Sequence, residues 1–131
     1  MGVKEEAIKL HGSGFNCAQS VAASCCEYTG LDKETTLAVS GGFGGGVRCG
    51  EICGAISGAV MVLGLANPYV DGTDAEAKNK IALLTKECTK SFKEQFGCVR
   101  CLDLKKAGHP CDELIAFGAE LAEKIVLENQ K

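Results

Sequence analysis

Hydrophobic and polar residues follow a helical period along most of this chain. Apolar side chains recur three and four positions apart, and no segment alternates between apolar and polar residues for long. This pattern predicts an all-α protein. Glycine, proline and helix-capping residues divide the pattern into five to seven helices, which we expect at about residues 3–11, 17–29, 32–39, 48–66, 74–96, 99–107 and 110–129.

Two helix starts carry recognisable capping residues. Asn16 is followed three positions later by Gln19, which is a variant of the capping box, and Gly30 ends the same helix. Thr73 and Glu76 form a capping box at the start of the longest helix. Local signals therefore predict where these two helices begin.

The segment 48–66 is apolar nearly all round, so we expect it to be the buried central helix of a single compact bundle. A glycine-rich loop precedes it, with five glycines among residues 41–46. That loop lacks the spacing of the nucleotide-binding motifs. Gly50, Gly54 and Gly58 recur four positions apart, which predicts a smooth helix face that another helix, a subunit or a cofactor can approach closely.

Composition and charge narrow the class of protein. The chain has 131 residues, of which 46% are hydrophobic and 24% charged, and this predicts one compact soluble domain over residues 1–131. A formal net charge of −3 argues against nucleic acid as a partner. The longest apolar run, residues 52–66, is 15 residues long, whereas a membrane span needs roughly 20. No secretory signal follows Met1, so we expect a cytoplasmic protein.

Nine cysteines are the most unusual feature of the composition. Without a secretory signal the compartment is reducing, so this number indicates metal, cluster or redox chemistry rather than a disulfide framework. The cysteines are Cys17, Cys25, Cys26, Cys49, Cys53, Cys88, Cys98, Cys101 and Cys111.

Four of these cysteines lie in or beside the first two turns of four different predicted helices: Cys17, Cys53, Cys101 and Cys111. A helix N-terminus stabilises negative charge, so we expect it to lower a thiol pKa from its usual value of roughly 8.5. Four thiolates are the ligand set of an iron–sulfur cluster or a structural zinc ion. The positions therefore predict that four helices bring their thiols to one site.

The remaining cysteines support weaker hypotheses. Cys98 and Cys101 form a C-x-x-C pair suited to thiol–disulfide exchange, and no histidine follows it, which excludes c-type haem attachment. Cys49 and Cys53 lie four positions apart on one face of the predicted central helix, so Cys49 is an extra ligand candidate, as is Cys98. The mid-helix cysteines are interpreted as core residues: Cys25, Cys26 and Cys88.

His11 and His109 are the only histidines. We interpret His11 as a solvated helix end and His109 as a loop or capping residue. Two imidazoles give little general acid–base capacity, so hydrolytic chemistry is disfavoured.

Several segments together carry a resemblance to a known family: residues 15–20, the loop 41–46, residues 53–58 (Cys-Gly-Ala-Ile-Ser-Gly), residues 92–97, Arg100 with Cys101, and Cys111. They resemble the C_GCAxxG_C_C family of redox-active proteins over about residues 3–127. The resemblance implies that the four signature cysteines are Cys17, Cys53, Cys101 and Cys111. The family is also similar to the non-haem part of split-Soret cytochrome c, which implies a helical homodimer and an iron–sulfur centre. This chain lacks haem attachment motifs, so haem is not expected.

Three functions are compatible with these observations. The leading hypothesis is a small redox protein in which the four signature cysteines bind an iron–sulfur cluster of the two-iron type and exchange electrons with a partner protein. Gly54 and Gly58 would then allow close approach to the cofactor, and the glycine loop would cover it. One alternative is a thiol–disulfide oxidoreductase or redox sensor that uses Cys98 and Cys101 or a pair of the signature cysteines. The other is a structural-zinc module or a helical adaptor module whose cysteines are packing residues. The sequence leaves open whether the protein is an enzyme or an electron carrier.

Overall fold

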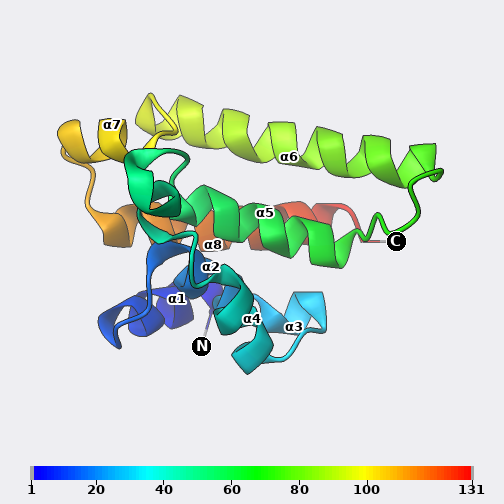
Figure 1. The fold of residues 1–131 in the computed structure, drawn as a ribbon, viewed down its shortest axis with the longest axis horizontal. Helices are drawn as coiled ribbons and strands as arrows, with labels where there is room; N and C mark the ends of the chain where they lie inside the picture. The colour runs from blue at the N-terminus through cyan, green and yellow to red at the C-terminus, as the bar shows by residue number, and fades with distance from the viewer. Residues whose placement is uncertain (1, 131) are drawn as a thin grey trace.

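The structure is a computed structural model that describes residues 2–130, and it confirms an all-α fold (Figure 1). In chain order the elements are α1 (Val3–Gly12), α2 (Cys17–Ser24), α3 (Cys26–Thr29), α4 (Lys33–Ser40), the π-helical turn η1 (Gly46–Gly50), α5 (Gly54–Ala66), α6 (Ala75–Phe96), α7 (Cys101–Lys106) and α8 (Cys111–Glu128). Within residues 2–130 there is no strand, and none of these helices is long and apolar enough to cross a membrane.

Helix α5 is the buried centre of the bundle, as its apolar sequence predicts. It packs against α2, α8 and α6. Figure 1 shows α6 along one side of α5, while α1, α2 and α4 lie across from it. The buried residues of α5 are Gly54, Ala55, Ile56, Gly58, Ala59, Val62 and Leu63.

The start of this central helix differs from the prediction. Helix α5 begins at Gly54 rather than near Arg48, because the preceding turn η1 contains two residues in the left-handed region, Val47 (φ 57°) and Arg48 (φ 61°). The turn folds back so closely that the N–H of Glu51 donates to the carbonyl of Gly46 at 3.1 Å. Residues 48–53 therefore do not continue the helix, although their composition suits one.

Glycines bring α2 and α8 unusually close to α5. A Cβ atom at Gly58 would lie 2.6 Å from the carbonyl oxygen of Ala18 in α2, and a Cβ atom at Gly118 in α8 would lie 3.0 Å from that of Ala55. The predicted smooth face is therefore covered by α2 of the same chain. Gly50 is not part of it, since this residue lies in η1.

The predicted helix over residues 17–29 is divided in two. Cys25 (φ −108°, ψ 18°) interrupts it, and Ser24 bonds back to the carbonyl of Val21 at 2.7 Å, a side-chain bond that competes with regular helix. The predicted start is confirmed, because Asn16 and Gln19 form a complete capping box. The predicted end is confirmed as well, with Gly30 left-handed at φ 74°.

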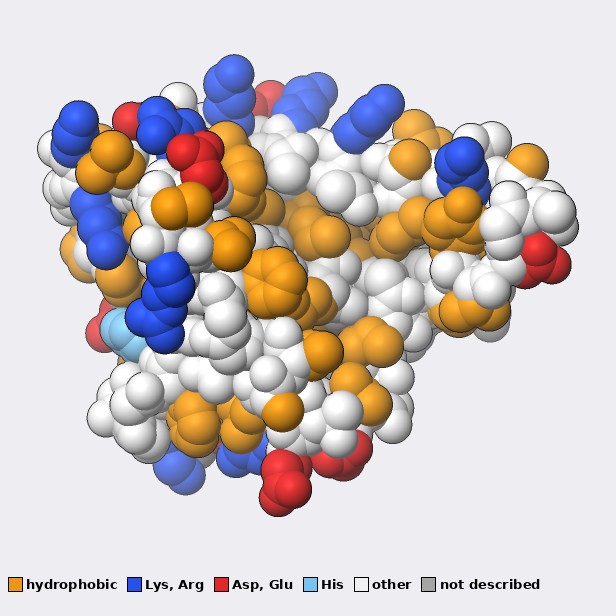
Figure 2. Space-filling view, in the orientation of Figure 1, with side chains coloured by type: hydrophobic (Ala, Val, Ile, Leu, Met, Phe, Trp, Pro, Cys, Tyr) orange, Lys and Arg blue, Asp and Glu red, His pale blue; other side chains and the backbone are white. Residues whose placement is uncertain are grey.

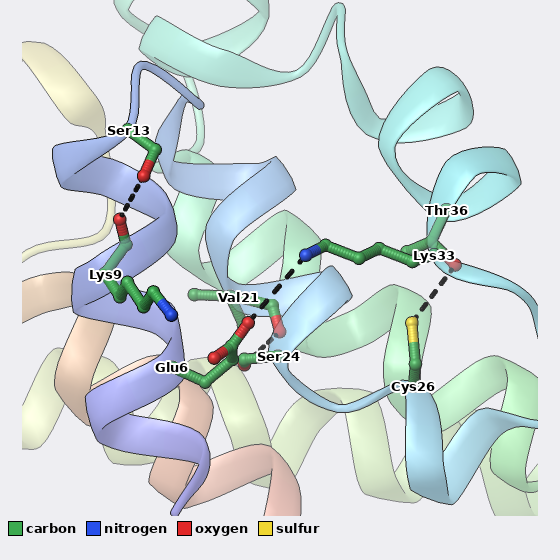
Figure 3. Close-up of polar contacts among 8 residues, drawn as sticks. All are labelled: Glu6, Lys9, Ser13, Val21, Ser24, Cys26, Lys33 and Thr36. Atoms are coloured by element: carbon green, nitrogen blue, oxygen red, sulfur yellow. Dashed lines mark hydrogen bonds and ion pairs between the residues drawn. The ribbon is translucent and has the colours of Figure 1, made fainter. Parts of the chain in front are cut away.

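Polar contacts join the short helices α3 and α4 to their surroundings (Figure 3). Cys26 Sγ lies 3.6 Å from Thr36 Oγ1, and Lys33 Nζ lies 3.9 Å from a carboxylate oxygen of Glu6 in α1. Cys26 is only half-buried, so the interpretation of this residue as a core cysteine is wrong.

Helix α6 packs through one narrow stripe. Leu84, Cys88 and Phe92 are its buried residues. Its cap differs from the prediction: Asp74, rather than Thr73, accepts the N–H of Ala77 at 3.0 Å. Thr73 instead bonds to Asp71 in the preceding turn.

Candidate four-cysteine site

All four signature cysteines stand at helix starts. Cys17, Cys101 and Cys111 are the first residues of α2, α7 and α8, and Cys53 is the N-cap of α5. Figure 1 shows these four helix starts toward the same end of the molecule. The positions predicted from sequence are confirmed, and each thiol lies beside the positive end of a helix.

A short antiparallel bridge joins the starts of α5 and α7. Ile52 pairs with Arg100. The N–H of Cys53 donates to the carbonyl of Val99 at 2.9 Å, and the N–H of Cys101 donates to that of Glu51 at 2.6 Å. Sequence analysis missed this contact, because two residues are too few to show an alternating pattern. The bridge also explains why α7 begins at Cys101 rather than at residue 99.

Direct backbone contact joins the starts of α2 and α5. A Cβ atom at Gly54 would lie 3.1 Å from both the Cβ atom of Cys17 and the backbone nitrogen of Ala18. Gly54 follows Cys53 in the chain, so the contact brings Cys17 and Cys53 near one another.

The glycine loop lies against these two helix starts. Asn16 donates from its side-chain amide to the carbonyl of Gly41 at 2.9 Å, and its side chain occupies the space that a Cβ atom at Gly44 would fill. On the other side, the carbonyl oxygen of Phe43 lies 3.2 Å from the Cβ position of Gly54. The loop therefore packs beside Cys17 and Cys53.

The pKa of Cys17 depends on burial and on the other three signature thiols. Burial is the main cause that raises the pKa of Cys17 to about 12 from its ordinary 9.0. The charges of Cys111, Cys53 and Cys101 raise it further, as does a side-chain hydrogen bond with Cys111. Each of the other three signature thiols is thus close enough to oppose ionisation of Cys17.

The pKa of Cys53 also depends on two of these thiols, Cys101 and Cys111. Burial raises the pKa of Cys53, the backbone N–H groups of Ala55 and Ile56 lower it, and the charges of Cys101 and Cys111 raise it. The amides at the start of α5 therefore act as predicted. The expected net lowering of the pKa is nevertheless wrong for Cys17 and Cys53, because burial outweighs the helix start.

The other ligand candidates are placed differently. Cys49 is exposed in η1, so the predicted shared helix face with Cys53 is wrong. Cys98 is half-buried and precedes α7, with its Sγ 3.9 Å from the carbonyl of Phe96. Cys25 and Cys88 are fully buried in the core, as predicted.

Both histidines contact oxygen atoms of other residues. Nδ1 of His11 lies 2.8 Å from a carboxylate oxygen of Asp112, which ties the end of α1 to the first turn of α8. Nε2 of His109 lies 3.1 Å from the carbonyl of Phe96. Across residues 2–130, no group of three or more His, Cys, Asp or Glu side chains is arranged to hold a metal ion.

These features define an all-helical, cysteine-rich protein with a candidate redox centre of four thiols. Residues 15–125 match the family model described as "Putative redox-active protein (C_GCAxxG_C_C)", and the chain belongs to this family. The predicted family is thereby confirmed. No curated protein and no solved structure matches the chain.

Proposed function

We propose that Cys17, Cys53, Cys101 and Cys111 bind an iron–sulfur cluster of the two-iron type, and that the protein carries or stores electrons. One observation carries the proposal: the four signature cysteines stand at the starts of four helices, where the charges of the other three oppose the ionisation of Cys17. Four thiolates so close together repel one another unless a cation compensates their charge.

Within residues 2–130 the four thiols are not arranged as metal ligands, so the proposal rests on their chemistry, which is that of the ligand set such a group requires. Iron–sulfur clusters are held by cysteine thiolates, and a bound metal removes the proton from a coordinating thiol outright. The backbone N–H groups of Ala55 and Ile56, which already favour the thiolate of Cys53, would offset the negative charge of a loaded site. When bound, the cluster would accept and release single electrons. The protein residues would hold it and exclude water.

Thiol–disulfide exchange is the less favoured alternative. The attacking species in exchange is the thiolate, and the raised pKa values of Cys17 and Cys53 leave little of it near neutral pH. Cys98 precedes α7 instead of lying in its first turn, so this residue lacks the helix-start position that motivated the pair with Cys101.

The proposal includes a redox partner protein, because an electron carrier has to exchange electrons with one. A homodimer and a cytoplasmic location also stay predictions. The glycine face no longer supports the dimer, since α2 covers Gly58.

The decisive measurement is iron, acid-labile sulfide and zinc per chain, with a visible spectrum, on protein expressed with iron and purified without oxygen. Equal iron and sulfide with a charge-transfer band is the expected result. Zinc without sulfide would instead identify a structural-metal module, and colourless, metal-free protein would overturn any metal function.

A matched pair of variants tests the ligand assignment. Cys17 and Cys26 are both half-buried and both first residues of a helix, but only Cys17 faces the other signature thiols. Cys17→Ser should abolish the chromophore and Cys26→Ser should retain it. Equal spectra of the two folded variants would contradict the assignment. Cys49→Ser and Cys98→Ser test the extra ligand candidates in the same way.

A further inference from the structure

An apolar groove of about 480 Å³ lies between α5 and α6, beside the glycine loop and η1. Figure 2 shows hydrophobic side chains along this hollow of the surface. The apolar side chains that line it are Phe43, Val47, Ile52, Ile56, Val60 and Met61. Its volume falls within the range of about 300–1,000 Å³ that is usual for small-molecule sites.

Three of these side chains are exposed without a partner that would bury them. Phe43, Val47 and Ile52 are 38%, 52% and 39% exposed. Val47 is also held at φ 57°, a conformation that is unfavourable for a β-branched residue. Val47 therefore lines the groove in a strained backbone conformation. Strained residues of this kind are common at ligand sites.

The polarity of the lining indicates the class of ligand. Among residues 2–130, no charged side chain lines the groove, and the polar side chains that line it are the hydroxyls of Ser57, Thr85 and Thr89. A phosphate or carboxylate would find no cationic partner there, whereas an uncharged molecule would lose little hydration on entry. The hydroxyl of Thr89 already donates to the carbonyl of Lys86 at 3.1 Å. The hydroxyls of Ser57 and Thr85 can donate to one or two carbonyl or ether oxygens of a ligand.

We propose that this groove binds an uncharged, apolar molecule that carries one or two hydrogen-bond acceptors. Such a ligand would touch Ile52, which precedes Cys53 and pairs with Arg100, the residue before Cys101. The proposal concerns binding alone and does not depend on what the four cysteines hold.

Titration with the neutral, carbonyl-bearing fluorescent probe 6-propionyl-2-(dimethylamino)naphthalene tests this site, with the anionic probe 8-anilino-1-naphthalenesulfonate for comparison. We expect one neutral probe per chain and weaker binding of the anionic probe. Val47→Gly should weaken neutral-probe binding about tenfold, since it removes an apolar contact. Glycine accepts the left-handed conformation, so this variant should stay folded.

Two further variants separate the groove from other apolar surface. Thr85→Phe should block the groove and abolish binding, whereas Leu83→Ser should leave binding unchanged, because Leu83 is 67% exposed on α6 outside the groove. Equal loss in Val47→Gly and Leu83→Ser would show adsorption to the general surface and overturn the proposal. Absence of probe binding, including binding blocked by a second copy of the chain in a dimer, would overturn it as well.

Discussion

Cys53 and Cys88 are buried to almost the same extent, 2% and 0% exposed, but their surroundings differ. Burial raises the pKa of both thiols, to about 12 for Cys88. The charge of Glu87 also raises the pKa of Cys88. Around Cys53, two backbone N–H groups favour the thiolate while the charges of Cys101 and Cys111 oppose it.

This contrast shows that burial by itself does not distinguish a site from a core. In the middle of α6, Cys88 packs in the core as a small apolar residue. The converging helix starts surround Cys53 with thiols and backbone amides, so its ionisation depends on four other residues: Ala55, Ile56, Cys101 and Cys111. Variants in the two regions should therefore affect different properties.

The largest effect on stability is expected in the core of α6. Phe92 is fully buried and packs against Phe96 and Phe117, with ring centroids 5.4 and 5.1 Å away. Phe92→Ala should lower the free energy of unfolding by about 3–5 kcal/mol, as measured by urea denaturation. Metal content per folded chain should not change. A loss of metal from the folded variant would show that the two regions are coupled.

The contact between α2 and α5 should respond next. Gly58→Ala places a methyl group against the backbone of Ala18 and should destabilise the protein by about 1–3 kcal/mol. Gly64→Ala is the control in the same helix, because no atom lies within 4 Å of its Cβ position. That change should stabilise the protein by about 0.4–1 kcal/mol. Thermal unfolding of both variants measures the difference, and equal shifts would contradict the packing described.

Alkaline pH should destabilise the metal-free protein through cysteines of both regions. The pKa values of Cys17 and Cys88 are about 12 in the folded protein against 9.0 ordinarily, so the unfolded chain releases these protons first. Stability of the metal-free protein is therefore full below pH 9.0 and falls as the pH rises toward 12. Urea midpoints measured across this range should show a shallower decline in Cys17→Ala and in Cys88→Ala.

Metal loading sharpens the same experiment. In the loaded protein the contribution of Cys17 should disappear, since a ligating thiol has no proton to lose, while that of Cys88 should persist. If the stability of the wild-type protein declines equally steeply between pH 9.0 and 12 with and without metal, Cys17 is not a ligand.

The smallest effect is expected from the cap of α2. Asn16→Ala removes the side-chain bonds to Gln19 and Gly41 and should cost about 1 kcal/mol of stability. Asp32→Ala is the matched control, because Asp32 caps α4 through Thr35. Both variants should lose similar stability in denaturation, but only Asn16→Ala should weaken metal binding at the site. Identical metal affinities would contradict a role of the cap in positioning Cys17.

The parts of the fold that depend on local signals could be predicted from the sequence. The capping box at Asn16, the left-handed ends at Gly30 and Gly97 and the apolar stripe of α6 all follow from residues within one or two helical turns. The positions of the four signature cysteines at helix starts could be predicted for the same reason.

Features that depend on contacts between distant segments could not be predicted from the sequence. Residues 48–53 look helical, but Val47 and Arg48 adopt the left-handed region beside three positive-φ glycines, and Ile52 pairs instead with Arg100. The sign of the pKa shift at Cys17 was missed because it depends on burial by the whole fold and on thiols from three other helices.

The bridge between Ile52 and Arg100 also affects the order in which the site can form during folding. It joins segments separated by the whole of α5 and α6, and the four cysteines span residues 17–111. Closing such a long loop costs entropy before any contact is gained, so pairings of this kind form late. During synthesis, an incomplete chain presents at most three of the four thiols until Cys111 has emerged. We therefore expect the proposed four-thiol binding to be completed only after the helical bundle has formed.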